Sequence, residues 1–447
     1  MNLQKFKENT KLKKNIISFA MASLFLLAGI YLYTSFAYYE EKKEFNVING
    51  TVQDPGDLYF AFYVDEVISK NMPAQGDGYI LDNTKSSCTN GATPELDTEN
   101  WSIIVKNMTI AKTKCTLHFK KEPIALSYVQ DLAKNADISS TDVYTVPNLS
   151  NDTCTYTFAY DGTTDNNLRY VGSNPCNYVT FNGESAGWRI IGVLNTPEGQ
   201  RVKLIRASSI GTYAWDDKPV EDENYGYLVT QTKSNWPDST LKEMLNSGAY
   251  YNRTTGTYYN GVIWSNKSES VTLDFTSNGL TGVAKKQIDT VTWGLGSCSS
   301  YNIAATEWYA CERGTKVYEG YATTWQGQVG LIHPSDYAYA TVGSSSSSRS
   351  QCLSESLFTW NESDQDCVTN DWLAPTADLS RGEMTLTGSY MPGTSEASFM
   401  INLNSSGGLS LVGVAENYGV RPSIYLVTTA SFSDGNGSQS NPYILES

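Results

Sequence analysis

Aromatic residues beside carboxylates are the groups in this chain whose types and spacing could hold a ligand. Trp215, Asp216 and Asp217 stand together after a predicted strand, where an aromatic face next to two carboxylates could bind a sugar or a cation. Trp236 and Trp372 each lie close to Asn, Asp and Pro in the sequence. These five residues form the candidate ligand-binding set. The alternative, which the sequence favours, is that the tryptophans pack in a core and the aspartates form turns.

Side chains that could catalyse a reaction are few. His333, followed by Pro334, Ser335 and Asp336, has the neighbours that a general base would need. The segment is better explained as the cap of a short helix, with Ser or Asp closing its first turn. Arg421 is interpreted as a structural residue that bonds carbonyl groups or a buried carboxylate, with an anion site as the functional alternative. No catalytic residue is therefore predicted.

Metal and cofactor sites are not predicted either. The chain contains no CxxC pair and only two histidines, His118 and His333. Calcium would need the regular Asp/Asn spacing of an EF-hand, which SFSDGNGSQSN at 431–441 only loosely suggests. The acidic run at 221–223 is interpreted as a solvated loop. A calcium site is thus left without support.

The eight cysteines all follow residue 87, and their even number in an exported chain favours disulfides. If neighbours in the sequence pair, each bridge closes one local segment. Other pairings stay open, because the sequence does not specify connectivity. The disulfide candidates are Cys88, Cys115, Cys154, Cys176, Cys298, Cys311, Cys352 and Cys367.

The N-terminus predicts export. Five lysines lie within residues 1–14, directly before an uncharged run at 15–39. Roughly 23 residues at about 1.5 Å each make about 35 Å of helix, enough to cross a hydrocarbon core of ~30 Å. The cationic flank stays cytoplasmic, so the C-terminus is expected outside the cell. The run is interpreted as a transmembrane signal-anchor partnered with the cytoplasmic membrane; the alternative is a signal peptide cleaved after Ala37, which would release the protein.

Charge and composition describe the exported part. The chain carries a net charge of -15, and residues 1–14 carry +4, so the remainder carries -19. Such a protein repels nucleic acid, which we exclude as a partner. Only 18% of residues are charged, whereas Tyr numbers 30 and Trp 10. Few charges and many aromatic residues are typical of an extracellular chain rich in strands.

The order of these patterns predicts an α+β protein of two extracellular domains. Periodic apolar residues predict strands in most segments and a helix within 238–251, opened by Asp238, Ser239 or Thr240 with Leu241, Met244 and Leu245 buried. The predicted parts are a cytoplasmic tail at 1–14, the membrane segment at 15–39, a small disulfide-bridged β domain at 41–121, a helix and linker at 122–152, a larger mixed domain at 153–430 and a tail at 431–447.

Six motifs in the larger domain resemble a family of uncharacterised bacterial extracellular domains. They cover about 250 residues in the same order. They are NYVTFNGESAGWRIIGV (177–193), KLIRASSIGTYAWDD (203–217), NWPDSTLKEMLN (235–246), VGLIHPSDY (329–337), NDWLAPT (370–376) and YGVRPSIYL (418–426). Their pattern is also distantly similar to C-type-lectin-like and formylglycine-generating-enzyme-like domains, which implies a mixed C-type-lectin-like fold and not a function.

Two departures limit what that distant resemblance implies. The EPN, QPD and WND segments with which sugar-binding C-type lectins hold calcium are absent, so calcium-dependent sugar binding is not expected. The last cysteine is Cys367, and YGVRPSIYL contains none, so the reactive cysteine pair of the formylglycine-generating enzymes is not expected either.

The predicted function is therefore noncatalytic recognition of a glycan or a surface protein at a bacterial cell envelope. The argument is a disulfide-braced scaffold with aromatic-rich loops and no assembled catalytic set. The alternatives are an exported enzyme acting on an envelope substrate and a structural component of the surface.

Overall fold

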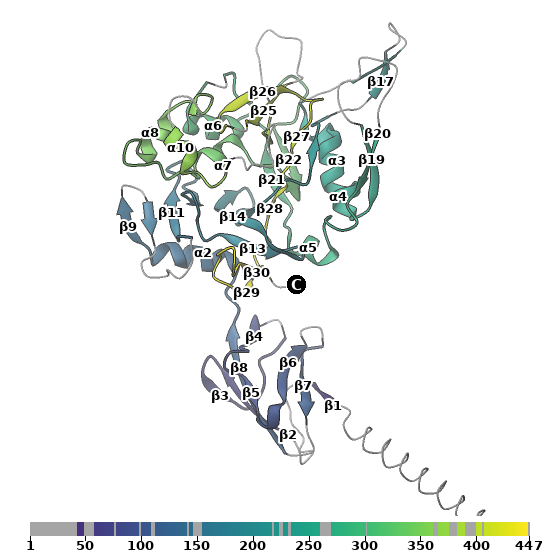
Figure 1. Ribbon diagram of the computed structural model, residues 1–447, viewed down its shortest axis with the longest axis vertical. Helices are drawn as coiled ribbons and strands as arrows, with labels where there is room; N and C mark the ends of the chain where they lie inside the picture. Colours follow the sequence, from purple (N-terminus) through teal and green to yellow (C-terminus); the bar gives the residue numbers. More distant parts are fainter. Residues whose placement is uncertain are drawn as a thin grey trace, which may run out of the picture. The chain divides into compact units, whose positions relative to one another are not determined.

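The structure is a computed structural model that describes residues 43–48, 58–75, 77–97, 100–108, 112–140, 143–145, 154–216, 219–222, 227–230, 234–259, 270–300, 302–360, 365–374, 382–388, 399–404 and 406–445. The chain divides into two compact units, Met1–Glu122 and Pro123–Ser447. Each unit has its own sheets and its own hydrophobic core (Figure 1).

The first unit packs two sheets face to face. One sheet has the order β1-β7-β6 and the other β3-β2-β8-β4, with β5 also paired to β8. Alternate residues of β8, among them Leu117 and Phe119, point inward and meet Ile103 and Val105 of the opposite sheet. The elements are β1 Lys43–Ile48, β2 Leu58–Val64, β3 Val67–Ser69, β4 Tyr79–Leu81, β5 Ser87–Cys88, η1 Thr89–Gly91, β6 Thr93–Asp97, β7 Ser102–Met108 and β8 Thr113–Lys121.

The second unit is built on an 11-stranded sheet whose centre is the long strand β14. Residues 188–194 of β14 are all buried, because neighbouring elements cover both faces. The main path of the sheet is β23 Val329–Gly330, β28 Ser423–Tyr425, β15 Gly199–Arg206, β14 Glu184–Thr196, β12 Leu168–Tyr170, β11 Thr157–Tyr160, β10 Val143–Thr145 and β9 Asp137–Ser140. The side path is β13 Tyr178–Phe181, β30 Tyr443–Leu445 and β29 Phe432–Asp434.

The other described strands of this unit form a second sheet and three hairpins. The five-stranded sheet has the order β16 Thr212–Tyr213, β27 Tyr418–Gly419, β24 Glu383–Gly388, β25 Phe399–Leu403 and β26 Leu409–Gly413. The hairpins are β17 Pro219–Asp222 with β18 Tyr227–Thr230, β19 Thr255–Tyr259 with β20 Ser270–Asp274, and β21 Val291–Gly294 with β22 Thr324–Gly327.

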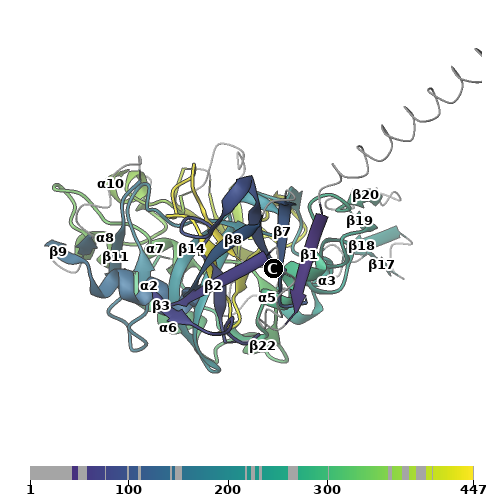
Figure 2. The ribbon, with the colours of Figure 1, turned by 90° about the horizontal axis from the view of Figure 1, so that it is seen from below.

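Short helices surround these sheets. In both ribbon views α8 and α10 lie at one end of the second unit, and α3 with the β19 and β20 hairpin lies at the other (Figures 1 and 2). The helices are α2 Ala125–Lys134, η2 Trp236–Asp238, α3 Thr240–Asn246, α4 Ala249–Asn252, α5 Gly282–Gln287, α6 Ala305–Glu312, α7 Pro334–Ala338, α8 Arg349–Ser354 and α10 Gln365–Thr369.

The predicted α+β class is wrong. In the part of the chain that the structure describes, strands predominate over helices. The apolar patterns that could have continued as helices are interrupted by turns, and the longest helix in the described ranges, α2, has 10 residues. The larger domain is therefore a sheet-based unit and not the mixed C-type-lectin-like domain that the motifs implied.

The predicted membrane segment at 15–39 lies outside the described residues. Within the part of the chain that the structure describes, no helix is both long and apolar enough to cross a membrane.

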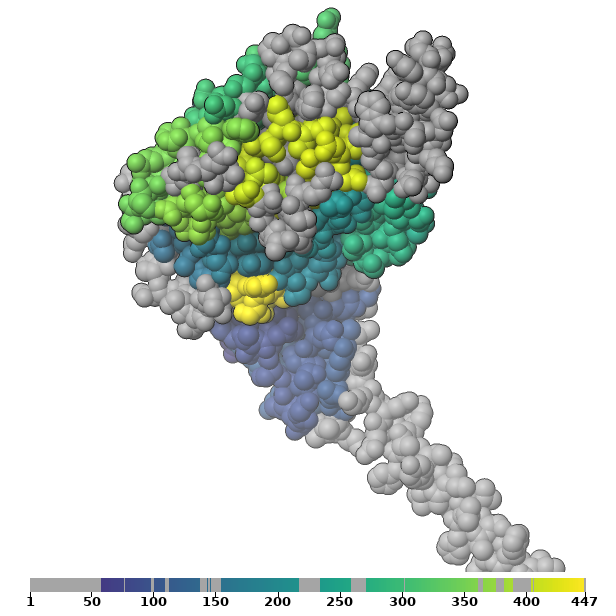
Figure 3. Space-filling model, turned by 45° about the horizontal axis from the view of Figure 1, so that its top comes forward, coloured from purple at the N-terminus to yellow at the C-terminus, as the bar shows by residue number. Residues whose placement is uncertain are grey.

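Segments predicted as a linker and a tail belong to the second unit. Helix α2 contacts β14 and β15 and buries Val129 against them. Strand β30 pairs with β13, and β28 pairs with β15. In the space-filling view, the yellow C-terminal residues accordingly lie against teal segments from the start of the unit (Figure 3).

All eight cysteines form disulfides between sequence neighbours. The bridges are Cys88–Cys115, Cys154–Cys176, Cys298–Cys311 and Cys352–Cys367. The predicted local pairing is confirmed. Four bridges are typical of a protein that folds in an oxidising, extracellular compartment.

Candidate functional site

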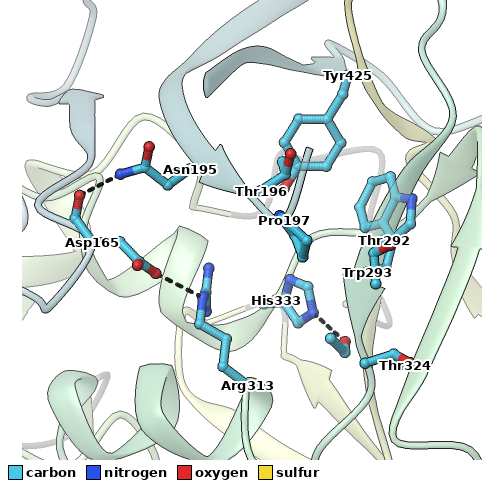
Figure 4. Close-up of a pocket in the computed structure, with 11 residues that line it drawn as sticks. Asp165, Asn195, Thr196, Pro197, Thr292, Trp293, Arg313, Thr324, His333 and Tyr425 are labelled. Atoms are coloured by element: carbon cyan, nitrogen blue, oxygen red, sulfur yellow. Dashed lines mark hydrogen bonds and ion pairs between the residues drawn. The ribbon is translucent and has the colours of Figure 1, made fainter. Parts of the chain in front are cut away.

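The second unit contains a cavity of about 340 Å³ where several of its elements meet. The turn between β14 and β15 forms one side, and the β21 and β22 hairpin forms another (Figure 4). The ends of α6, α7 and β28 and the loop between β11 and β12 contribute the rest. The lining residues are Asp165, Asn195, Thr196, Pro197, Thr292, Trp293, Gly294, Arg313, Thr324, His333 and Tyr425.

Two aromatic side chains form one wall of the cavity. Trp293 lies on β21, where alternation buries it together with Val291. Its ring meets the ring of Tyr425 with centroids 4.8 Å apart at an angle of 65°, and its Nε1 donates to the Gly327 carbonyl. Both side chains are largely buried, so the cavity reaches only part of each ring. This wall is rigid and apolar.

The opposite wall is polar and is held by Asp165. Arg313 caps the C-terminus of α6, and its guanidinium lies 3.4 Å from the centroid of the Tyr309 ring. Asp165 accepts a hydrogen bond from the Tyr309 hydroxyl and lies 3.6 Å from Arg313 Nε. The Asn195 Nδ2 group donates to the Asp165 backbone carbonyl at 2.5 Å. These contacts fix the arginine and the amide beside the cavity.

Several polar groups of the lining have no hydrogen-bond partner among the described residues. Among them are the Nη2 group of Arg313, the Oδ1 atom of Asn195 and the hydroxyl of Thr324. They come from the C-cap of α6, from β14 and from β22, so a ligand in the cavity can reach a charged donor, an acceptor and a hydroxyl. The arrangement suits a small polar ligand with an apolar face.

A buried charge network lies next to the lining residue His333. Asp336 accepts hydrogen bonds from Lys203 Nζ at 2.5 Å, from Arg169 Nη1 at 2.7 Å and from the His333 backbone N–H at 3.0 Å. Arg169 also pairs with Asp161. Lys203, Arg169, Asp161 and Asp336 are all buried, and their formal charges cancel. The network ties β12 and β15 to α7, and so fixes the helix that follows His333.

The two carboxylates of this network have lowered pKa values. Burial alone would raise the pKa of Asp336, but Lys203, the His333 hydrogen bond and Arg169 hold it well below its usual range. Burial likewise opposes the effect of Arg169, Asn167 and Thr163 on Asp161, whose pKa is also lowered. Both groups are thus ionised in the folded protein wherever an unfolded Asp is ionised.

We expect protonation of Asp161 and Asp336 to destabilise the folded protein in acid. A carboxylate whose pKa is lowered on folding stabilises the folded state fully above its unfolded pKa of about 3.9, and that stabilisation is lost as pH falls through the folded pKa. The free energy of unfolding, measured in urea between pH 6 and pH 2, should therefore be constant to about pH 5 and fall steeply below about pH 4. A free energy that stays flat down to pH 2 would show that the network does not stabilise the fold.

His333 lines the cavity but is not arranged as a general base. Its Nε2 bonds the Gly294 carbonyl at 3.0 Å, and since a carbonyl only accepts, Nε2 is the donor. Its Nδ1 is 3.8 Å from the nearer oxygen of Asp336, beyond hydrogen-bond distance. The neighbouring hydroxyl of Ser335 is buried and donates to Glu312. The prediction that HPSD caps a short helix is confirmed, because α7 begins at Pro334 and Asp336 accepts from His333 N.

The predicted ligand-binding residues lie away from this cavity's lining. Trp215 and Trp236 are 0% and 1% exposed and pack against each other with centroids 4.9 Å apart. Asp216 accepts a hydrogen bond from the Thr240 backbone at the start of α3. Trp372 is 5% exposed and packs under Arg189. The tryptophans therefore fill the interior, and Asp217 lies outside the described residues.

Two of these tryptophans nevertheless support the cavity from behind. Trp236 contacts Trp325 with centroids 5.8 Å apart, and Trp325 contacts Trp293 at 6.5 Å. A chain of aromatic rings thus runs from Trp215 to the aromatic wall. The role is packing, which explains why residues that look like a binding motif in sequence are buried.

Arg421 has the structural role that the sequence suggested. Its Nε and Nη2 donate to one oxygen of the buried Glu383 at 2.8 and 2.5 Å, and Nη2 also donates to the Leu373 carbonyl. This interpretation is confirmed.

No group of three or more His, Cys, Asp or Glu side chains that could hold a metal ion occurs in the described ranges. No protein-family model, curated protein or solved structure matches this chain.

Proposed function

We propose that this exported protein binds a sugar residue of a glycan in the cavity between Trp293 and Arg313. The observation that carries the proposal is the pairing of an aromatic wall with three unpartnered polar groups. A pyranose ring has apolar C–H faces and a rim of hydroxyls, and it needs both kinds of contact at once. The cavity volume of about 340 Å³ falls at the lower end of ordinary ligand sites.

The proposal places binding rather than catalysis at this site. The carboxylate and the imidazole of the lining already have partners: Asp165 contacts Tyr309 and Arg313, and His333 bonds Gly294. The export signal at 1–39 would display the cavity outside the cell, either tethered to the membrane or released after Ala37. Membership of the bacterial extracellular family that the six motifs resemble stays a prediction.

Retention of the purified full chain on an array of mono- and oligosaccharides tests the proposal. Arg313→Gln is expected to weaken retention at least about tenfold, because one charge-assisted hydrogen bond is worth about 1.5–3 kcal/mol. The control is Lys134→Gln, which removes one positive charge from the exposed surface of α2 and should leave retention unchanged. Equal retention by Arg313→Gln and the wild type would remove Arg313 from the site, and retention of no sugar by the wild type would refute the proposal.

A further inference from the structure

One disulfide joins the two walls of the cavity. Cys298 follows β21, which carries Thr292, Trp293 and Gly294 of the lining, and Cys311 lies in the last turn of α6, two residues before Arg313. The bridge closes a segment with a sequence separation of 13 residues. The aromatic wall and the charged donor are therefore connected by one short covalent link.

The backbone beside this bridge has no spare room. A Cβ atom on Gly294 would lie 2.4 Å from the Glu312 carbonyl oxygen, and one on Gly296 would lie 2.1 Å from the Cys311 carbonyl oxygen. Gly296 N donates to the same Glu312 carbonyl at 3.1 Å. The end of β21 thus rests directly on the C-terminus of α6, and the Gly294 carbonyl in turn bonds His333. Any separation of the two segments must also displace lining residues.

This bridge is more open to a reductant than the others of the second unit. Cys311 is half-buried, whereas Cys352 and Cys367 are both 0% exposed and Cys154 and Cys176 are buried. A thiol–disulfide exchange needs access to a sulfur atom, so the Cys298–Cys311 bridge is expected to react first in this unit.

We propose that the Cys298–Cys311 disulfide is a redox-sensitive clasp that holds the cavity in its binding shape. A dithiol reductant attacks the bridge, gives two electrons and two protons to the two sulfurs, and becomes a disulfide itself, while Cys298 and Cys311 become thiols. Without the bridge, the segment between β21 and α6 gains freedom and Arg313 is no longer held opposite Trp293. The expected loss of sugar binding on reduction rests on the proposed function. The expected loosening of the cavity wall does not depend on it.

Amide hydrogen exchange in the full chain tests the clasp independently of any ligand. The readout is the backbone amides of Leu295, Gly296 and Ser297, which bond across to Thr323, Glu312 and Lys316. In the double variant Cys298→Ser/Cys311→Ser these amides should exchange at least about tenfold faster, since local opening sets their rate. The matched control, Cys88→Ser/Cys115→Ser, removes the half-exposed bridge of the other unit and should leave them unchanged.

Treatment of the folded wild type with dithiothreitol provides the same measurement if the double variant does not fold. Faster exchange at the three amides, together with lower retention on the sugar array, supports the clasp. Unchanged exchange after mass spectrometry has shown that Cys298 and Cys311 are reduced would overturn it. Faster exchange in a protein that retains no sugar when oxidised supports the clasp and refutes the proposed function instead.

Discussion

Asp336→Asn is expected to lower the free energy of unfolding by about 3–5 kcal/mol. It leaves two buried cations, Lys203 and Arg169, with Asp161 as the remaining carboxylate of the network. The side chains of Asp336, Lys203 and Arg169 are at most 1% exposed, so water cannot replace the missing charge. The substitution keeps the size of the side chain, removes its charge and replaces one acceptor oxygen by an NH2 donor. Urea unfolding at pH 7, followed by tryptophan fluorescence, measures the difference.

Asp131→Asn is the matched control for this prediction. Asp131 pairs with Lys134 on the exposed surface of α2, with both side chains more than 60% exposed. Such a pair contributes about 0–1 kcal/mol, so the control should unfold almost like the wild type. If Asp336→Asn and Asp131→Asn cost the same, the buried network does not stabilise the fold beneath the cavity.

Thr324→Trp is expected to abolish sugar retention, with a loss of at least about 100-fold, because the indole occupies the volume that the ligand needs. Thr324 lines the cavity at the start of β22 and is exposed, so the larger side chain has room without disturbing the core. Far-ultraviolet circular dichroism should match that of the wild type, and retention on the sugar array measures the loss.

Gln326→Trp controls for the added tryptophan. Gln326 is exposed on the same strand, two residues from Thr324, and is absent from the cavity lining. Alternation along β22 places both side chains on the same face. Gln326→Trp should therefore bind like the wild type. Full retention by Thr324→Trp would mean that the sugar binds elsewhere.

Local features of this fold were predictable because they depend on nearby residues. The disulfides join sequence neighbours, and α3 buries Leu241, Met244 and Leu245 as its periodicity indicates. The sequence offers Asp238, Ser239 or Thr240 as the N-cap of α3. In the structure the N-cap is Ser239, whose side chain accepts a hydrogen bond from Lys242 N. The cap and the buried face of α3 are determined within about one or two turns of helix, and the disulfides close segments with sequence separations of 13 to 27 residues.

The candidate site was not predictable, because its residues are distant in sequence. Asp165 and Tyr425 line the same cavity although most of the second unit lies between them in the chain. Asn195, Thr292 and Thr324 carry no local signal of binding, since each reads as an ordinary strand or turn residue. The hydrophobic alternation in VTWG would have placed Trp293 on a buried strand face, but not beside Tyr425.

Local sequence patterns leave two questions open that the whole fold decides. Trp215, beside Asp216 and Asp217, and Trp236 and Trp372, near Asn, Asp and Pro, could form a ligand-binding set or pack in a core, and the structure buries all three rings. The predicted fold class was wrong because short helices between strands give the same local spacing of apolar residues as the helices of a mixed α+β domain. Burial is decided by long-range strand pairing, which a local pattern does not contain.

A crystal structure of the protein soaked with the sugar that the array retains best tests the central claim most directly. We predict a sugar ring beside Trp293 and Tyr425, with hydroxyls within hydrogen-bond distance of Arg313 Nη2, Asn195 Oδ1 and the Thr324 hydroxyl. A sugar bound elsewhere, with this cavity filled only by water, would contradict the account.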